Sequence, residues 1–385
     1  MITPRPELLR TPPAVHGGRS SLSDALAAGH ALRHDFSACI NAFGPADVVR
    51  RAVATAPLEE YPDPYSRAAR SAAARRWDCE PECVAFGAGA AELIYAVASA
   101  CLRRGDHVLI AEPAFGEYAR AALINGARPT AVRAPDFPAI PLPALAAEIH
   151  RARPRLSFVA APVSPTGEAL PLSALLDIAE ECRRADTLLV LDQAYDAFSA
   201  APLGTPALPR HENVLHLRSL TKDHALAGVR AAFAAGPAGV IEAMGRTRAP
   251  WTAPAAAQAA AVAALSDEAD AHVRHTTAAL RAEAGRIANA CAAHGLRVAR
   301  SSTHYLIIHC GHGESARNRL LAEHGILVRD CASFGLAEWI RVAARTPREN
   351  DALIAALPSI SGSRRLGQPL PHTRSTDTLE PLEEA

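Results

Sequence analysis

Lys222 is the only lysine in a chain of 385 residues, because 39 of the 40 lysine-plus-arginine side chains are arginines. A lysine amine can lose its proton and attack a carbonyl carbon, whereas an arginine guanidinium stays charged at ordinary pH. The chemistry that needs such an amine is Schiff-base formation, with a carbonyl substrate or an aldehyde cofactor. A compositional bias against lysine could also leave one by accident, so the neighbours of Lys222 must decide.

Those neighbours suit an anchored phosphate. Ser219 and Thr221 carry hydroxyls just before Lys222, and Arg230 follows shortly after a glycine. Hydroxyls and a guanidinium beside an amine would hold a phosphate next to it. The pattern Ser-Leu-Thr-Lys followed by Ala-Gly-x-Arg resembles the Schiff-base segment of the fold-type I pyridoxal-phosphate enzymes, the aspartate aminotransferase superfamily with its class I and II aminotransferases. This resemblance implies pyridoxal 5'-phosphate as the cofactor, attached to Lys222.

A second phosphate signal lies in the stretch Gly87-Ala88-Gly89-Ala90-Ala91-Glu92. It follows a short apolar run at 84–86 and precedes an apolar helix pattern from Leu93. A strand, a glycine-rich turn and a helix N-terminus form an anion cradle, because free N–H groups and the helix dipole both favour a negative charge. The stretch resembles the family's Gly-Asn-Gly-x-x-Glu loop, with Ala88 in place of asparagine, which implies cofactor binding at Gly89, Ala90 and Ala91.

Short apolar strands alternate with helices through the middle of the chain. We expect strands at 108–110, 157–160 and 188–191, and helices at 47–56, 66–77, 116–125 and 172–184. This alternation predicts an α/β fold with a doubly wound, mostly parallel sheet, and such sheets bind ligands at the carboxyl ends of their strands. The resemblance implies a large cofactor-binding domain over 47–265.

Candidate site residues follow those strands. Asp192 ends the run 188–191, where a buried carboxylate needs a cationic partner such as a protonated pyridine nitrogen. The other roles come from the resemblance: Phe115 stacks on the pyridine ring, while Ser164, which replaces an asparagine, and Tyr195 face the phenolic oxygen. Gln193 departs from the family's usual glutamate.

The later part of the chain predicts a smaller α+β domain over 266–360, with strands at 305–309, 326–329 and 339–343, a helix near 315–324, and alanine-rich helices from 254 to 294 running into it. Arg341 lies on an otherwise apolar strand, and a buried guanidinium needs an anion. In the resembling family the matching arginine binds the substrate carboxylate, and Arg329 matches one near the far end of the substrate. For each, the alternative is an internal ion pair.

Residues 1–46 predict an irregular arm that covers the active site. Its His16-Gly17-Gly18 and Asp35-Phe36-Ser37 segments, with the turn at Pro250-Trp251, resemble the threonine-phosphate decarboxylases of cobalamin synthesis. That resemblance places His16 and Asn41 near the substrate, although Cys39 and Ala42 depart from the pattern.

The two prolines of Tyr61-Pro62-Asp63-Pro64 exclude regular structure there. The segment resembles one in which a tyrosine reaches across a dimer interface to the cofactor phosphate, so we expect a homodimer. The alternative is that Tyr61 packs within its own turn.

Composition narrows the partners. Forty acidic residues balance forty basic ones, which argues against nucleic acid or a membrane surface as the main partner. No apolar run is long enough for a membrane span and the N-terminus lacks a signal core, so we expect a cytoplasmic protein. Neither the eight cysteines nor the sixteen histidines show metal-ligand spacing, so no metal is expected. The polar, proline-rich stretch 361–385 predicts a disordered tail.

Three functions remain open. The motifs of the arm favour a lyase of the threonine-phosphate decarboxylase type, acting at the α-carbon of an amino acid or amino-acid phosphate in a dedicated biosynthetic pathway. The alternative is an aminotransferase similar to histidinol-phosphate aminotransferase, for which Tyr195 is suited. A remote third is a catalytically idle ligand-sensing domain, but such regulators carry a DNA-binding module, and the arm is too short for one.

Overall fold

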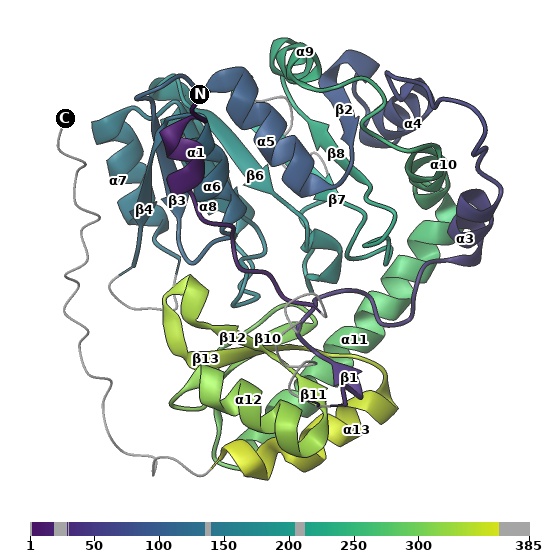
Figure 1. Ribbon diagram of the computed structural model, residues 1–385, viewed down its shortest axis with the longest axis vertical. Coiled ribbons are helices and arrows are strands. Elements are labelled where there is room, and N and C mark those ends of the chain that lie inside the picture. Colours follow the sequence, from purple (N-terminus) through teal and green to yellow (C-terminus); the bar gives the residue numbers. More distant parts are fainter. Residues whose placement is uncertain (1, 19–28, 30, 135–139, 205–211, 362–385) are drawn as a thin grey trace.

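A computed structural model describes residues 2–18, 29, 31–134, 140–204 and 212–361 (Figure 1). The tail expected at 361–385 lies outside the described residues, except for Ser361. Within the described part of the chain, no helix is both long and apolar enough to cross a membrane.

A seven-stranded sheet forms the centre of the larger part of the molecule (Figure 1). Its order is β2-β8-β7-β6-β5-β3-β4, and only β8 runs antiparallel to its neighbours. The strands are β2 (Val84–Gly87), β3 (His107–Ala111), β4 (Arg128–Val132), β5 (Leu156–Ala160), β6 (Leu188–Asp192), β7 (Val214–Ser219) and β8 (Ala232–Ala235). The α/β, mostly parallel sheet predicted from the sequence is confirmed.

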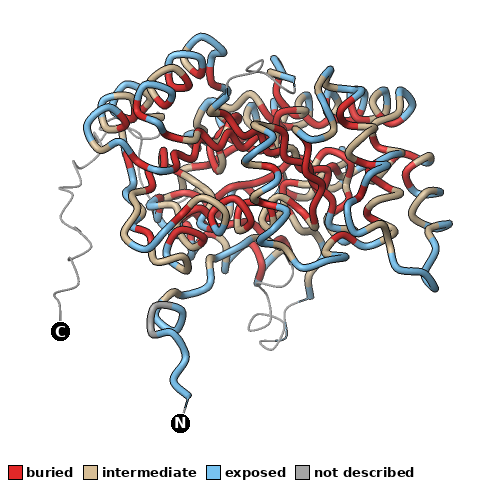
Figure 2. Tube along the Cα trace, turned by 90° about the horizontal axis from the view of Figure 1, so that it is seen from above, coloured by how far each residue is buried: buried red, intermediate tan, exposed pale blue. Residues whose placement is uncertain are grey.

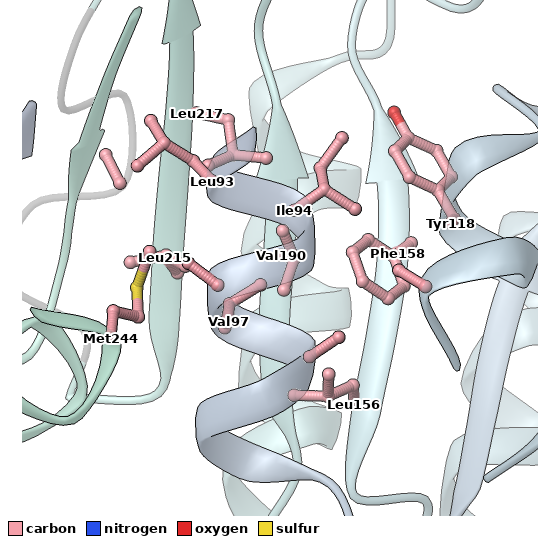
Figure 3. Packing of buried hydrophobic residues seen from close by; sticks show 14 of the residues in the cluster. Leu93, Ile94, Val97, Tyr118, Leu156, Phe158, Val190, Leu215, Leu217 and Met244 are labelled. Carbon is pink, nitrogen blue, oxygen red and sulfur yellow. The ribbon is translucent and has the colours of Figure 1, made fainter. Parts of the chain in front are cut away.

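Helices cover both faces of this sheet. One apolar cluster joins it to α5 (Ala90–Cys101), α6 (Glu117–Ile124) and α9 (Ala238–Thr247), and another joins it to α7 (Leu142–Ala152) and α8 (Leu172–Arg184). Figure 3 shows Leu93, Ile94 and Val97 of α5 packed onto side chains of the strands. Because both of their faces are buried, β2, β3, β5 and β6 are apolar runs, which is why they could be found in the sequence. β4, β7 and β8 were not predicted: β4 is largely exposed, and β7 contains His216 and Arg218.

A third cluster lies at the β2 edge, where α3 (Asp47–Ala54), α4 (Arg67–Trp77) and α10 (Ala255–Ala264) pack together. The 27-residue helix α11 (Asp267–Ala293) then runs from α3 to the smaller sheet (Figure 1). Its N-cap is Ser266, whose hydroxyl accepts from the Ala269 N–H and so satisfies one of the first-turn donors.

The smaller sheet has the order β12-β13-β10-β9 and is antiparallel throughout. Its strands are β9 (Arg297–Val298), β10 (Tyr305–His309), β12 (Arg329–Cys331) and β13 (Leu336–Ala343), and the helices α12 (Gly313–His324) and α13 (Pro347–Ala356) share its apolar cluster. The single strand expected at 326–329 is wrong. The chain forms β11 (Ile326–Leu327) and then β12, because the two segments pair with different strands.

The arm is more regular than expected. It contains the helix α1 (Pro6–Arg10), which packs beside α6, and the strand β1 (His34–Asp35), which pairs in parallel with β11. In Figure 1 the purple arm therefore passes from the larger part of the molecule to the smaller one. Figure 2 shows the N-terminal end of the arm at the exposed surface, whereas Phe36, Cys39 and Asn41 further along the arm are buried. The domain limits 47–265 and 266–360 stay a proposal.

Candidate active site

The predicted site residues gather at the carboxyl end of the seven-stranded sheet. Phe115 follows β3, Ser164 follows β5 and Asp192 ends β6, while Lys222 lies in the turn after β7. Parallel strands bring these positions to one edge of the sheet, although the first and the last, Phe115 and Lys222, are 107 residues apart in the chain.

Lys222 is partly buried in that turn, and its Nζ lies 5.9 Å from the centre of the Tyr195 ring. Burial lowers the pKa of the Lys222 amine below its ordinary value, and the nearby positive charges of Arg341 and Arg230 act in the same direction. The backbone carbonyl of Lys222 accepts from the Asn41 N–H at 2.9 Å, which ties the turn to the arm. The turn therefore presents an amine that loses its proton more readily than an exposed lysine.

Asp192 is 7% exposed and accepts two hydrogen bonds from neutral donors. The Tyr118 hydroxyl donates to its Oδ2 at 2.6 Å, and the Ala194 N–H donates to its Oδ1 at 2.9 Å. Burial raises the pKa of this carboxyl, while the two hydrogen bonds and Lys222 oppose the rise. Within the described residues no cation forms a salt bridge with Asp192, so its negative charge is available to a ligand.

A cradle for an anion lies beside these groups. Gly87 and Ser219 flank Ala232 of β8 in the register of the sheet, so the start of α5 and the Lys222 turn are close neighbours. Gly89 has a φ of 96°, and a Cβ there would collide with the Arg230 guanidinium. The first-turn N–H groups at Ala90 and Ala91, which have no partner within the helix, thus lie next to a positive charge.

The hydroxyls expected to complete the cradle lie at the end of β7. Ser219 Oγ and Thr221 Oγ1 are 2.6 Å apart, and both side chains are buried. Together with Arg230 and the N-terminus of α5, these hydroxyls can donate hydrogen bonds to a phosphate dianion. The cradle, the buried Asp192 and the Lys222 amine therefore fit the phosphate, ring nitrogen and aldehyde of pyridoxal phosphate.

Tyr195 and Phe115 lie on two sides of the site. The Tyr195 ring meets Tyr305 edge-on at 4.9 Å, and its hydroxyl is a neighbour of the buried Cys39 thiol. Burial raises the pKa values of both Tyr195 and Cys39, so both groups are protonated at neutral pH. Phe115 packs edge-on against Tyr118 at 5.8 Å and lies 5.6 Å from the His16 ring.

Arg341 comes from β13 and points toward the larger sheet. Its Nη2 donates to the Ser37 carbonyl at 2.9 Å and its Nη1 donates to Ser164 Oγ at 3.2 Å, while its buried Nε has no hydrogen-bond partner. Among the described residues no carboxylate lies within salt-bridge distance of it. The internal ion pair considered as the alternative is therefore not observed for this 6% exposed arginine.

Arg329 pairs with Arg341 across β12 and β13, which puts the two side chains on the same face of the small sheet. Its Nη2 donates to Ser333 Oγ at 2.6 Å and to the Val15 carbonyl at 3.2 Å. Its Nη1 lies 3.4 Å from Asp330 Oδ2, so the internal ion pair is present here. That carboxylate oxygen also contacts Arg317 at 2.6 Å, so two guanidinium groups share it.

We call residues 14–18 the strap, because the arm crosses the site there. Besides the bond from Arg329, His16 Nε2 lies 2.7 Å from Glu117 Oε1, and the Gly18 N–H donates to Ser37 Oγ at 2.8 Å. A Cβ on Gly17 would lie 2.6 Å from the Ser37 carbonyl oxygen, so only a glycine fits against that backbone. The strap thus covers both Arg341 and the Phe115 side of the site.

The side chains of Asn41 and Tyr61 contact residues that were not predicted for the site. The Asn41 amide is buried and donates to the Asp223 carbonyl at 2.9 Å and to Thr276 Oγ1 at 2.8 Å. Both of its donors are thus used within the protein, and its role toward the substrate stays a prediction. Tyr61 is 83% exposed, with its ring 4.8 Å from the Trp251 ring.

Two residues of this site were not predicted from the sequence. Tyr118 and Glu117 lie in the first turn of α6, directly after Phe115. Phe115 directly precedes the helix, and the Tyr118 N–H donates to the Phe115 carbonyl at 3.1 Å, so a spacing of three residues across the helix start brings the two rings together. That spacing was the available signal. The described residues contain no group of three His, Cys, Asp or Glu side chains suited to a metal ion.

Comparisons with known proteins agree with this geometry. The family model for aminotransferase class I and II matches residues 35–357. The histidinol-phosphate aminotransferase of Methylobacillus flagellatus is 33% identical over 310 residues, covering 80% of this chain and 82% of the relative. That of Xanthomonas campestris pv. campestris (strain B100) is 32% identical over 309 residues, covering 78% and 85%.

Solved structures show the same fold. The crystal structure of histidinol-phosphate aminotransferase from Sinorhizobium meliloti in complex with pyridoxal-5'-phosphate superposes with a TM-score of 0.83 at 26% identity, covering 92% of this chain and 96% of that one. Aspartate aminotransferase from Thermus thermophilus with maleate gives a TM-score of 0.80 at 21% identity, covering 94% and 100%. The second likeness concerns the fold alone.

Proposed function

The chain belongs to the family of class I and II aminotransferases and is a pyridoxal-phosphate-dependent enzyme, and we propose that it transfers the amino group of a substrate that carries an anionic group. The observation that carries the proposal is that one site contains a partly buried amine, Lys222, and a buried arginine, Arg341, which has no carboxylate partner among the described residues.

Pyridoxal phosphate, when bound, accepts the electron pair released from the substrate's α-carbon. The cradle formed by the α5 N-terminus, Ser219, Thr221 and Arg230 would hold the phosphate, and Asp192 would pair with the ring nitrogen. Lys222 Nζ would hold the aldehyde carbon, and the Lys222 amine would carry a proton to and from the substrate's α-carbon. The lowered pKa of Lys222 suits both tasks, because the neutral amine is both the nucleophile and the base.

The two arginines define the substrate end. Arg341 would bind a carboxylate or phosphate with two parallel hydrogen bonds, which a guanidinium can form and an ammonium cannot. Arg329, on the same face of the small sheet, would donate hydrogen bonds to a second anionic group at the far end of the substrate. A positive pair of this kind favours amino acids with an acidic or phosphorylated side chain, and amino-alcohol phosphates such as the histidinol phosphate that names the relatives.

Transamination is favoured over the decarboxylation suggested by the arm motifs. The relatives compared above are aminotransferases, and the family match covers nearly the whole described chain. The His16-Gly17-Gly18 segment, which suggested the decarboxylase, here forms the strap, with His16 bound to Glu117. The amino group, rather than carbon dioxide, is therefore the group we expect to leave the substrate.

The test is a donor screen with the cofactor-loaded protein and 2-oxoglutarate. Donors are common amino acids, their side-chain phosphates and histidinol phosphate, and the products assayed are glutamate and carbon dioxide. We expect glutamate from donors with an anionic side chain, and no carbon dioxide. Stoichiometric carbon dioxide without glutamate would contradict the proposal and would favour decarboxylation instead.

The dimer stays part of the proposal. Tyr61 and Trp251 are both exposed in the single chain, at 83% and 46%, and their rings lie 4.8 Å apart with a tilt of 34°. An exposed aromatic pair of this kind suits a contact with a second copy. Mixing inactive Lys222→Ala and Tyr61→Ala subunits should restore part of the activity if Tyr61 serves the neighbouring site. A fully active monomer would contradict this.

A further inference from the structure

The hydroxyl of Tyr118 occupies an unusual place for a core residue. Its ring is 1% exposed, stacked parallel to Phe158 at 4.8 Å and edge-on to Phe115. Figure 3 shows the ring beside Phe158 within the apolar cluster, with the hydroxyl oxygen at its outer end. Two aromatic contacts fix the ring, and hence they fix the position of the hydroxyl that donates to Asp192 Oδ2.

That hydroxyl is a neutral donor to a charged group. Burial and the neighbouring Asp192 raise the pKa of Tyr118 well above its ordinary value, so the phenol keeps its proton. A histidine or arginine in its place would cancel the charge of Asp192, whereas a phenol stabilises the carboxylate and leaves the charge in place. The remaining neighbours of Asp192 are the Ala194 N–H, the Lys222 amine and the protonated Tyr195.

We propose that Tyr118 is a positioning residue that keeps Asp192 ionised and in one orientation, the state in which it can pair with the protonated ring nitrogen of the cofactor. This inference rests on the cofactor assignment above and adds a residue that acts through Asp192 alone. The Tyr118 hydroxyl need not touch the cofactor or the substrate.

The sign of the pH effect follows from the pKa of Asp192. Burial raises that pKa and the Tyr118 hydrogen bond lowers it, so removing the hydroxyl raises it further. Asp192 then takes up a proton at a higher pH, and a protonated carboxyl no longer pairs with a pyridinium. The affinity for pyridoxal phosphate in a Tyr118→Phe variant should therefore begin to fall, as the pH is lowered, at a higher pH than in the wild type.

The experiment titrates cofactor-free protein with pyridoxal phosphate between pH 5 and 9 and follows the nitrogen-15 signal of a ring-labelled cofactor. Tyr118→Phe should weaken binding about tenfold at neutral pH, the usual effect of losing a hydrogen bond to a charged group, and move the ring nitrogen toward its neutral signal. Tyr118→Met, which also lacks the hydroxyl, should reproduce both changes.

Tyr305→Phe is the matched control. Tyr305 is equally buried and donates to a backbone carbonyl, that of Val163, at 3.0 Å. Its removal should cost similar stability, measured by urea denaturation, and leave the ring-nitrogen signal unchanged. If Tyr305→Phe shifts that signal as much as Tyr118→Phe, the proposal is overturned.

Combining Tyr118→Phe with Asp192→Asn separates two hypotheses: that Asp192 pairs with the cofactor, and that Tyr118 acts through Asp192. Tyr118→Phe should add little to Asp192→Asn, because residues that act through one another are not additive. If Asp192→Asn is itself without effect on binding and signal, the cofactor assignment of Asp192 fails. If Asp192→Asn has a large effect while Tyr118→Phe matches the wild type, the cofactor assignment stands and the inference about Tyr118 is wrong.

Discussion

Asp192 and Arg341 lie at opposite ends of the site and are almost equally buried, at 7% and 6% exposed, but they are held in different ways. The two oxygens of Asp192 each accept one bond, from donors that belong to the large sheet and its helices. Arg341 donates to Ser37 of the arm and to Ser164 of the large sheet, and its Nε has no partner.

The difference shows which end of the site is complete before a ligand arrives. At the cofactor end, α6 and the turn after β6 already hold both oxygens of Asp192. The side chain therefore has to move little when a cation pairs with it. The substrate end is assembled from three segments and still lacks an anion, which a buried guanidinium needs. Cofactor binding should therefore depend on the core, and substrate binding on the closure of the arm.

The largest effect is expected from Lys222→Ala, which removes the nucleophile from the cofactor end. Activity should fall by about a thousandfold or more, in the range for loss of a positioned acid-base group. Borohydride reduction followed by mass spectrometry should find the cofactor on Lys222 in the wild type and no adduct in the variant. Lys222→Arg is the control, because it keeps the positive charge and should be equally inactive. If an adduct persists in Lys222→Ala, the cofactor is not attached to Lys222.

The next largest effect is expected from Arg341→Lys at the substrate end. A point charge cannot reproduce the two parallel hydrogen bonds of a guanidinium. We expect a loss of ~2–5 kcal/mol in kcat/KM, the range for disrupting a buried charge pair. Affinity for the cofactor should stay within about twofold of the wild type, because the two ends are held separately. Unchanged kinetics with every anionic donor would show that Arg341 is structural.

Stability measured without ligands sharpens the contrast between the two ends. Arg341→Met replaces a buried charge that lacks a carboxylate partner, so the free energy of unfolding should stay within about 1 kcal/mol of the wild type or increase. Tyr118→Phe should decrease it by about 1 kcal/mol, because it removes a completed buried hydrogen bond. Urea denaturation of the cofactor-free variants measures both. A large loss of stability in Arg341→Met would mean that the substrate end is as complete as the cofactor end.

The smallest effect is expected from His16→Ala, which removes the contact between the strap and Glu117 and leaves the contacts of Glu117 with Tyr95 and Arg120 in place. The His16 side chain is 46% exposed, so its contact with Glu117 is worth ~0.5 kcal/mol or less. KM for the amino donor should therefore rise by only about twofold. Glu112→Gln, which breaks an exposed pair with Arg133 outside the strap, is the control and should leave KM unchanged. If KM rises more in the control variant, the strap does not contribute to binding of the amino donor.

Much of the cofactor end could be predicted from the sequence because its signals are local. A single lysine flanked by hydroxyls, a glycine turn before a helix, and polar residues after buried strands are each visible within about ten residues. Parallel strands then convert positions in the chain into positions at one edge of the sheet. The α/β architecture followed for the same reason, since strands buried on both faces leave continuous apolar runs.

The partners of these residues were decided only by the tertiary structure. Tyr118 and Asp192 are 74 residues apart, and Arg341 and Ser37 are 304 apart, so no local pattern pairs them. The strand expected at 326–329 was split because β11 pairs with the distant arm, which the sequence of that segment does not record. The type of a side chain is a property of its own position, whereas the charge it meets when buried depends on what the rest of the chain packs against it. The sequence therefore determined which groups could do chemistry, and packing decided which of them were already satisfied and which still needed a ligand.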